Sequence, residues 1–397
     1  MQKHILVISQ YFYPEPFRIN DMCLEWVKRG YKVTVLTGIP NYPQGEFYEG
    51  YSKKERRNEN WNGVEIIRSP LVARGHSSIR LFLNYISFVW SGWKWKRKTK
   101  LKADYVFTFE VSPMTQALIG VWYAKKYNVP NYLYVQDLWP ENVEIVTGIT
   151  NPIVIKPISK MVNYIYKNCT KIFATSPSFV EEIKKRVEDK EKVIFLPQYA
   201  EEFYQPMERK PVAEIPGSSK FKIIFTGNIG KAQGLDILPK AAELLKDENI
   251  EFVIVGDGRY REEFEREIRE RCVNDMFILI ERQPAERIPS LLAACDAAFL
   301  SFMNTPLFEK TIPAKLQSYM ACGMPIIASA SGETERIIQE AKCGYCSPIG
   351  DEKALAQVII RIQTDAELSK MSENSIKYCD NYFNKQIIMD GLNQYFY

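Results

Sequence analysis

The sequence predicts an α/β protein of two Rossmann-like domains, each built on a doubly wound parallel sheet. A chain of 397 residues is long enough for about two to three domains. Residues 4–37 have the pattern of a strand, a helix and a strand, and residues 222–236 have that of a strand followed by a glycine-rich loop and a helix. Residues 197–217, between these patterns, are rich in Pro and Glu and are typical of an interdomain linker.

The composition is that of an ordinary globular protein. Hydrophobic residues make up 46% and charged residues 25%, and a net charge of +4 is too small to indicate a nucleic-acid-binding protein. The eight scattered cysteines predict reduced, mostly buried thiols in a cytoplasmic protein. Only two histidines, His4 and His76, are present, which argues against histidine-based metal sites. The first apolar run, residues 5–8, is too short for a secretory signal.

The loop after the first predicted strand distinguishes this chain from dinucleotide-binding enzymes. We expect a strand over residues 4–9, a helix over 20–29 and a strand over 32–37. The first loop contains no glycine, so the G-x-G-x-x-G fingerprint of a NAD enzyme is absent. The loop carries Glu15 and Arg18 instead. Arg18 is a candidate ligand for a substrate phosphate, and a surface charge is the equally weighted alternative.

Two further loops of the first domain are candidate ligand-binding loops, because ligands of open parallel sheets bind at the carboxyl ends of the strands. The rigid aromatic loop of residues 38–43 includes Asn41 and Tyr42. Gln136 and Asp137 follow another predicted strand. Asp137 either holds or deprotonates a substrate hydroxyl or is a cap for the next turn, and it has no Asp-x-Asp partner for a metal.

Residues 79–102 combine an aromatic, apolar run with a dense cationic cluster. The apolar part, residues 81–90, is shorter than the roughly 20 residues that a helix needs to span a bilayer. Aromatic residues followed by basic ones are typical of an amphipathic helix on an anionic membrane surface, so we expect membrane contact here. A core helix with a basic last turn is the alternative, and stacking on nucleic acid is a more remote one.

The second domain carries a phosphate-binding pattern. Its first strand is followed by a loop that holds Gly227, Asn228 and Lys231, and the amides of such loops cradle phosphates. The loop lacks G-K-[ST] and is therefore not a P-loop. Gly256 and Gly258, after the next predicted strand, would let a nucleotide approach the backbone closely.

Residues 309–329 form the centre of a second predicted phosphate site, with the pattern of a loop, a helix, a turn and a buried strand. Thr311 is the candidate cap of the helix, and Pro313 falls in its first turn. Lys315 would add a full charge to the partial positive charge of the helix start. Helical spacing predicts a buried stripe of Leu316, Tyr319 and Met320.

The runs SYMACGMPIIAS, residues 318–329, and SGETE, residues 331–335, resemble the nucleotide-sugar site of GT-B glycosyltransferases of the family 4 type. The resemblance covers nearly the whole chain and is closest to WbuB-like bacterial transferases of L-fucosamine and other amino sugars. It implies the GT-B fold, with two Rossmann-like domains facing across a cleft. We expect the acceptor domain over residues 1–199 and the donor domain over 200–379, with residues 380–397 packing back on the first domain.

The resemblance also assigns roles to residues. Its acidic E-x7-E pair survives as Glu309 and Gln317, and Ser318 stands where an acid is usual. The candidate catalytic carboxylates are Asp137, Glu309 and Glu15. The candidate acceptor-binding residues are Arg18, Asn41, Tyr42 and Gln136. The candidate ligands of the donor and its diphosphate are Gly227, Asn228, Lys231, Gly256, Gly258, Thr311, Lys315, Gln317, Ser318, Glu333 and Glu335.

The implied reaction is retaining transfer of a sugar, such as N-acetyl-L-fucosamine, from a UDP-sugar to an undecaprenyl-diphosphate-linked glycan in O-antigen, lipopolysaccharide or capsule synthesis. No metal or cofactor is expected, because lysines and helix amides can offset the charge of the leaving diphosphate. The enzyme would be cytoplasmic, peripheral to the inner face of the cell membrane through residues 79–102, and without a nucleic-acid partner. A UDP-sugar 2-epimerase of the same fold, a catalytically silent nucleotide-sugar-binding scaffold and, least favoured, a NAD-dependent enzyme are the alternatives.

Overall fold

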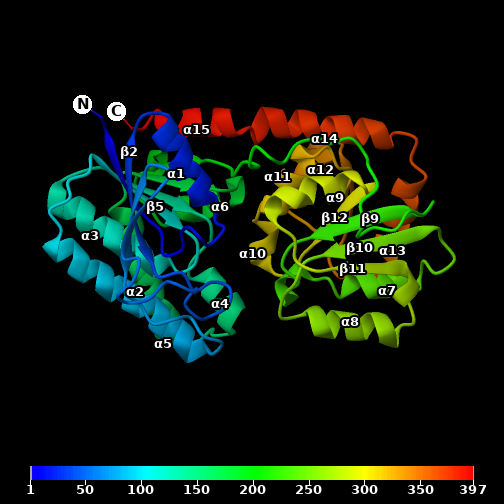
Figure 1. Cartoon of the computed structure of the whole chain (residues 1–397), viewed down its shortest axis with the longest axis horizontal. Coiled ribbons are helices and arrows are strands. Elements are labelled where there is room, and N and C mark those ends of the chain that lie inside the picture. Colours follow the sequence, from blue (N-terminus) through cyan, green and yellow to red (C-terminus); the bar gives the residue numbers. More distant parts are fainter. Residues whose placement is uncertain (1, 397) are drawn as a thin grey trace. The chain divides into compact units, whose positions relative to one another are not determined.

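A computed structural model describes residues 2–396 and shows two compact units (Figure 1). The first unit comprises the chain up to Leu196 together with Tyr395 and Phe396, and the second comprises Pro197–Gln394. The chain therefore leaves the first unit close to the expected residue 199. The expected return of residues 380–397 is shorter than predicted, because residues 380–394 belong to the second unit.

An eight-stranded sheet forms the first unit, in the order β3-β4-β2-β1-β5-β6-β7-β8. It is parallel except for the edge strand β3, which pairs antiparallel with β4. The strand order reverses between β1 and β5, which is the topological switch point of a doubly wound sheet. The strands are β1 His4–Ile8, β2 Lys32–Gly38, β3 Asn58–Trp61, β4 Val64–Ser69, β5 Tyr105–Glu110, β6 Asn131–Val135, β7 Lys171–Ala174 and β8 Val193–Phe195.

Helices pack on both faces of this sheet, because successive residues of a buried strand point to opposite sides. Phe107 of β5 meets Trp26 of α1, with ring centroids 5.0 Å apart. The neighbouring Val106 belongs to a cluster that includes Phe88 of α2 and Ile119 of α3. The helices are α1 Arg18–Lys28, α2 Ser78–Lys98, α3 Ala117–Tyr127, α4 Glu141–Thr147, α5 Pro152–Lys167 and α6 Pro177–Lys184, with 3₁₀ turns η1 Met114–Gln116 and η2 Lys190–Lys192.

The hairpin of β3 and β4 is an addition to the predicted elements. Asn62 and Gly63 join the two strands with φ angles of 49° and 87°, the left-handed values that a tight hairpin turn requires. The Asn-Gly pair is the strongest short hairpin signal a sequence can carry. This hairpin matters for function because β4 delivers the segment after Ser69 to the carboxyl edge of the sheet.

The end of the chain completes the first unit. The ring of Phe396 lies against Trp26 of α1, with centroids 5.7 Å apart, and against Tyr132 of β6, at 5.4 Å. The Tyr132 hydroxyl donates a 2.6 Å hydrogen bond to the carbonyl of Tyr395. Only these last residues bear out the expected return of the chain onto the first unit.

Six parallel strands form the second unit, in the order β11-β10-β9-β12-β13-β14. Counted along the chain this is the Rossmann order 3-2-1-4-5-6, with the switch point between β9 and β12. The strands are β9 Phe221–Thr226, β10 Ile250–Val255, β11 Phe277–Ile280, β12 Ala297–Ser301, β13 Ile326–Ser329 and β14 Gly344–Ser347.

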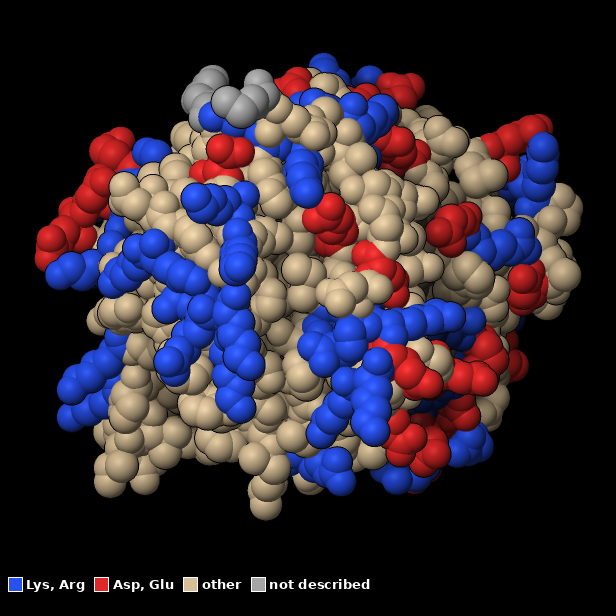
Figure 2. All heavy atoms as spheres, turned by 60° about the vertical axis from the view of Figure 1, so that its left-hand side comes forward, with Lys and Arg blue, Asp and Glu red and all other residues tan. Residues whose placement is uncertain are grey.

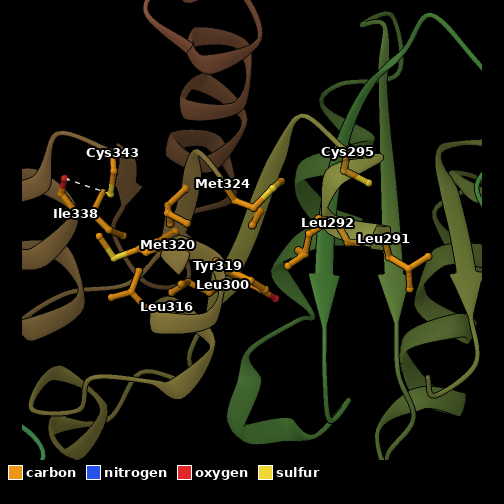
Figure 3. Packing of buried hydrophobic residues seen from close by; sticks show 14 of the residues in the cluster. Leu291, Leu292, Cys295, Leu300, Leu316, Tyr319, Met320, Met324, Ile338 and Cys343 are labelled. Atoms are coloured by element: carbon orange, nitrogen blue, oxygen red, sulfur yellow. Dashed lines mark hydrogen bonds between the residues drawn. The ribbon is translucent and has the colours of Figure 1, made fainter. Parts of the chain in front are cut away.

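The helices of the second unit enclose its core. Figure 3 shows Leu316, Tyr319 and Met320 of α11 in one buried cluster with Leu300 of β12, and the stripe predicted for this helix is confirmed by exposures of 0–1%. The helices are α7 Ile237–Glu243, α8 Arg261–Glu270, α9 Ile288–Ala293, α10 Pro306–Glu309, α11 Ala314–Ala321, α12 Glu333–Ala341, α13 Glu352–Gln363, α14 Leu368–Tyr382 and α15 Lys385–Asn393, with 3₁₀ turns η3 Lys231–Gln233, η4 Asn274–Met276 and η5 Ala285–Arg287.

Candidate active site

Lys315 lies at the switch point of the second unit, in the first turn of α11. Its amine donates a hydrogen bond to Oε1 of Gln233 and lies 3.9 Å from the centroid of the Phe225 ring. Burial lowers the pKa of this amine to about 7. Within residues 2–396 no carboxylate pairs with it. A basic group without a counter-ion at this position is suited to bind an anion.

Gly227 leaves the space that Lys315 occupies. A Cβ on Gly227 would lie 2.7 Å from Cε of Lys315, and the φ of Gly227 is +129°. Any other residue here would therefore collide with the lysine and strain the backbone. The structure thus brings Gly227 and Lys315 together at one end of the sheet.

Lys231 lies apart from this group. Its amine is 3.2 Å from a carboxylate oxygen of Glu263 on α8, and the side chain is 72% exposed. The sequence analysis expected Lys231 and Lys315 to act on one diphosphate. The structure does not bring the two amines together, because Lys231 turns toward the acidic first turn of α8.

Gly256 and Gly258 have a structural explanation that needs no nucleotide. A Cβ on Gly256 would be 1.9 Å from the carbonyl oxygen of Gly227, and one on Gly258 would be 2.3 Å from that of Ile229. The loops after β9 and β10 therefore touch each other, and the glycines permit that contact. Asn228, which lies between Gly227 and Ile229 in the loop after β9, is exposed.

The start of α11 differs from the predicted one. Pro313, expected inside the first turn, is the N-cap residue and carries no capping hydrogen bond. Thr311, the expected cap, donates instead to the carbonyl of Leu307 at 2.9 Å. The amides of the first turn are thus left without a side-chain cap, which is the condition in which a helix start binds anions.

Gln317 and Ser318 are not open to a donor. Gln317 is 1% exposed, and the hydroxyl of Ser318 donates to the carbonyl of Ala314 at 3.1 Å. Both follow the helical period that buries Leu316 and Tyr319, so they face the interior of the unit. In this structure both side chains face the interior, and their contact with the donor stays a prediction.

The acidic residues of this region differ in their surroundings. Glu309, at the end of α10, is exposed, and its carbonyl oxygen would be 2.0 Å from a Cβ on Gly332. Glu333 is 5% exposed and pairs with Arg336 at 2.9 Å. Glu335 accepts a 3.0 Å hydrogen bond from Gln339. The two glutamates of α12 thus have partners on their own helix, and Glu309 presents its carboxylate to solvent.

Glu15 holds two loops of the first unit together. One carboxylate oxygen accepts the backbone N–H groups of Asn41 and Tyr42, both at 2.7 Å, and the other accepts that of Phe12 at 3.3 Å. The side chain is 2% exposed, and burial raises its pKa to about 7. In this structure the carboxylate is buried against backbone amides, and a catalytic role for Glu15 stays a prediction.

Asn41 is also a structural residue. It is fully buried, and its Oδ1 accepts hydrogen bonds from the backbone N–H of Arg74 at 2.8 Å and from Nδ2 of Asn84 at 3.3 Å. The expectation that Asn41 contacts an acceptor is therefore wrong. Tyr42, beside it, is partly exposed and lies 5.5 Å from the ring of Tyr11.

Asp137 follows β6 and lies beside the end of β5. Its Oδ2 accepts the backbone N–H of Ser112 at 2.7 Å, and burial raises its pKa above the ordinary value. Glu110, the last residue of β5, is fully buried, and burial together with the charge of Asp137 raises its pKa well above the usual range. Glu110 is not among the site residues predicted from the sequence, although a carboxylate at the end of an apolar strand is a pattern that indicates a candidate site residue.

Gln136 and Arg18 lie near the same edge of the first sheet. The backbone N–H of Gln136 donates to the carbonyl of Glu110 at 2.8 Å. Arg18, the first residue of α1, is partly buried, and its charge acts on the hydroxyl of Tyr134 in β6. These two expected acceptor residues therefore stay in the neighbourhood of Asp137.

The chain is similar to glycosyltransferases. Residues 208–378 match the sequence family described as "Glycosyl transferases group 1". The matched residues lie within the second unit. A "Probable glycosyltransferase WbjE" of Pseudomonas aeruginosa is 28% identical over 241 residues, which are 58% of this chain and 59% of that protein. A "Putative colanic acid biosynthesis glycosyl transferase WcaI" of Escherichia coli K12 is 25% identical over 330 residues, or 79% of each chain.

The fold extends this similarity to the whole chain. The crystal structure of Anabaena Alr3699/HepE in complex with UDP-glucose matches with a TM-score of 0.71 and 13% identity, over 99% of each chain. Both doubly wound units thus have the GT-B fold, as predicted. The expectation of a glycosyltransferase is confirmed at the level of the domain and of the relatives' names, while the WbuB-like specificity rests on the resemblance alone.

Proposed function

We propose that this protein is a retaining glycosyltransferase of bacterial surface-polysaccharide synthesis, which moves a sugar from a UDP-sugar to a polyprenyl-diphosphate-linked acceptor. The group 1 domain and the relative named for colanic acid biosynthesis support transfer to a polysaccharide precursor. The similar fold that binds UDP-glucose in HepE supports a UDP-sugar donor. The WbuB-like resemblance points to an N-acetylated deoxy amino sugar such as N-acetyl-L-fucosamine.

The observation that carries this proposal is the buried amine of Lys315 at the switch point of the second unit, which within residues 2–396 contacts Gln233 and Phe225 but no carboxylate. A nucleotide diphosphate supplies the negative charge that this buried amine lacks. Amides at the uncapped start of α11 would share the same phosphate oxygens.

The reaction needs no protein nucleophile in this scheme. The bond between the anomeric carbon and the diphosphate oxygen breaks, and the acceptor oxygen forms the new bond on the same face of the sugar. The acceptor's proton passes to the leaving diphosphate oxygen, while Lys315 stabilises the charge that develops there. Asp137, whose carboxylate is already held by Ser112, orients the acceptor hydroxyl.

The surface of α2 supports a peripheral membrane location at the inner face of the cell membrane. One side of α2 is buried, since a Cβ on Gly92 would meet the side chain of Ile119 at 2.2 Å. Large apolar residues 44–73% exposed lie on the other side at helical spacing: Ile79, Phe82, Leu83, Ile86 and Trp90. Basic residues follow in the last turn, and Figure 2 shows Lys and Arg side chains gathered on a face with broad uncharged surface.

Residues 79–102 were expected either to contact a membrane or to form a core helix. The helix α2 has features of both, because one of its sides packs on the unit and the other leaves apolar side chains exposed. A helix of this kind lies in the interface of a membrane with anionic lipids. Among the described residues, no helix is sufficiently long and apolar to cross a bilayer.

The test is a transfer assay with three donors, UDP-N-acetyl-L-fucosamine, UDP-N-acetylglucosamine and UDP-N-acetylgalactosamine, and vesicles that contain an undecaprenyl-diphosphate-linked sugar. We expect UDP release and an extended lipid-linked glycan with one of the donors. UDP binding without transfer would favour a silent scaffold, and an epimerised free sugar would favour the epimerase.

A further inference from the structure

Arg74 is a residue of the first unit to which no role has been assigned so far. It follows β4, and its backbone is fixed by neighbouring loops. Its N–H donates to Oδ1 of Asn41 at 2.8 Å, and the N–H of the next residue, Gly75, donates to the carbonyl of Gly45 at 2.7 Å. The position of this side chain is therefore set by the carboxyl edge of the sheet.

Aromatic side chains surround the guanidinium of Arg74. Nη1 donates to the hydroxyl of Tyr11 at 2.8 Å, and the group lies 5.3 Å from the centroid of the Tyr42 ring. The Tyr85 hydroxyl, on α2, also hydrogen-bonds to Arg74. The Tyr11 ring stacks on Phe17 at 5.2 Å, which holds its hydroxyl in place.

No carboxylate pairs with Arg74 in the part of the chain that the structure describes. Two other buried or partly buried arginines of the first unit do have one: Arg68 lies 3.0 Å from Glu59, and Arg186 lies 2.9 Å from Glu141. Removing a guanidinium from water without a counter-ion is costly, so a partly buried one with unused N–H donors is suited to an anionic ligand.

The place of Arg74 identifies the ligand as part of the acceptor. Asp137, at the same edge of this sheet, acts electrostatically on Tyr85, which also contacts Arg74. Tyr85 belongs to α2, the helix with the exposed apolar side. A lipid-linked acceptor brings an apolar chain, a diphosphate and a sugar hydroxyl, and this part of the unit offers an apolar helix side, a guanidinium and a carboxylate.

We propose that Arg74, aided by the hydroxyls of Tyr11 and Tyr85, binds the phosphoryl oxygens of the acceptor's diphosphate. This assignment rests on the proposed lipid-linked acceptor and deepens it. A guanidinium binds phosphate oxygens through two parallel N–H groups, a geometry that an ammonium does not reproduce.

The experiment measures binding and needs no glycosyl transfer, so it does not depend on the success of the transfer assay. Calorimetry of the full chain uses three probes: farnesyl diphosphate below its aggregation limit, farnesol, and a disaccharide that ends in glucuronic acid. The variants are Arg74→Gln, Arg74→Lys and the charge-matched control Arg269→Gln, whose side chain is exposed on α8. UDP affinity reports in each variant that the second unit is intact.

We expect Arg74→Gln to weaken farnesyl diphosphate binding about 10- to 100-fold, the loss of a charge-assisted contact. Arg74→Lys keeps the charge and should recover only part of this loss. Such a partial recovery would show that the weaker binding of Arg74→Gln is not due to misfolding. Farnesol and UDP affinities should stay unchanged. Equal farnesyl diphosphate affinity in Arg74→Gln and Arg269→Gln would overturn the assignment, and so would an Arg74 dependence confined to the glucuronate probe.

Discussion

The charge of Lys315 changes near neutral pH, and this makes the proposed donor site testable by titration. In the protein without ligand the pKa of this amine is about 7, because the side chain is removed from water. A bound diphosphate favours the ammonium form and raises this pKa. UDP-sugar binding should therefore take up a proton above pH 7, and affinity should fall as the pH rises.

The size of the effect follows from the fraction of ammonium form. With a pKa of about 7, about half of the amines are charged at pH 7 and about 1% at pH 9. If only the charged form binds the diphosphate, the affinity drops about 50-fold over this range, which is about 2.3 kcal/mol. Lys315→Met should weaken binding about 10- to 100-fold at pH 7 and should remove the pH dependence.

Calorimetry with UDP-N-acetylglucosamine in buffers of different ionisation enthalpy measures affinity and proton uptake together. UDP-N-acetylglucosamine is a better ligand than UDP for this experiment, because both of its phosphates are diesters and do not titrate near neutral pH. Lys231→Met is the matched control: its amine is exposed and paired with Glu263, so its loss should change the affinity less than about threefold. The reasoning about Lys315 is refuted if affinity is constant from pH 6 to pH 9 in the wild type, or if Lys231→Met costs more than Lys315→Met.

Three other expectations concern the loops and the exposed side of α2. Gly256→Ala places a Cβ 1.9 Å from a carbonyl oxygen at a φ of +150°. We expect this substitution to lower the free energy of unfolding, measured in urea, by more than about 2 kcal/mol. The control Gly217→Ala, whose Cβ would have no atom within 4 Å, should change it by less than about 0.5 kcal/mol. Glu15 has a folded pKa raised from 4.5 to about 7, so its ionisation makes wild-type stability fall as the pH rises from about 4.5 to about 7. The wild type should therefore lose up to about 3 kcal/mol relative to Glu15→Gln over that range, and parallel stability curves would contradict this. Ile79→Ser with Phe82→Ser should lower partition to anionic vesicles at least about tenfold in a sedimentation assay, while Ile387→Ser, 57% exposed in the second unit, should leave it unchanged.

The two sheets could be predicted from the sequence because strands buried on both faces are continuous apolar runs. The strands at Ile5–Ile8 and Ile223–Phe225 are of this kind. The edge strand β3 is not a continuous apolar run. Three of its residues, Asn58–Asn60, are polar and the strand is half exposed, so only the Asn-Gly turn after it indicates the hairpin. Without that hairpin, Arg74 could not be assigned to the end of a strand.

The side chains of the site were harder to predict than the loops that carry them. Position after a strand placed Glu15, Asn41 and Asp137 at the correct edge. It did not show that Glu15 and Asn41 turn inward to accept the N–H groups of neighbouring loops. That choice depends on which backbone groups of other loops lack partners, and a single sequence does not contain this information.

Among residues 2–396, Arg74 in the first unit and Lys315 in the second are basic side chains at the carboxyl edge of their sheets that no carboxylate pairs with. The difference between the two residue types matches the two diphosphates of the proposed reaction. The amine of Lys315, with a pKa of about 7 in the free protein, takes up a proton when the donor diphosphate binds, and the ammonium then stabilises the charge that develops as this diphosphate leaves. The acceptor diphosphate keeps its charge throughout, and an arginine, which is always protonated, binds a constant charge with fixed geometry. Exchange of the two residue types should therefore harm the two substrates unequally: Lys315→Arg should preserve charge but abolish the pH dependence of donor affinity, and Arg74→Lys should weaken the acceptor without affecting the donor.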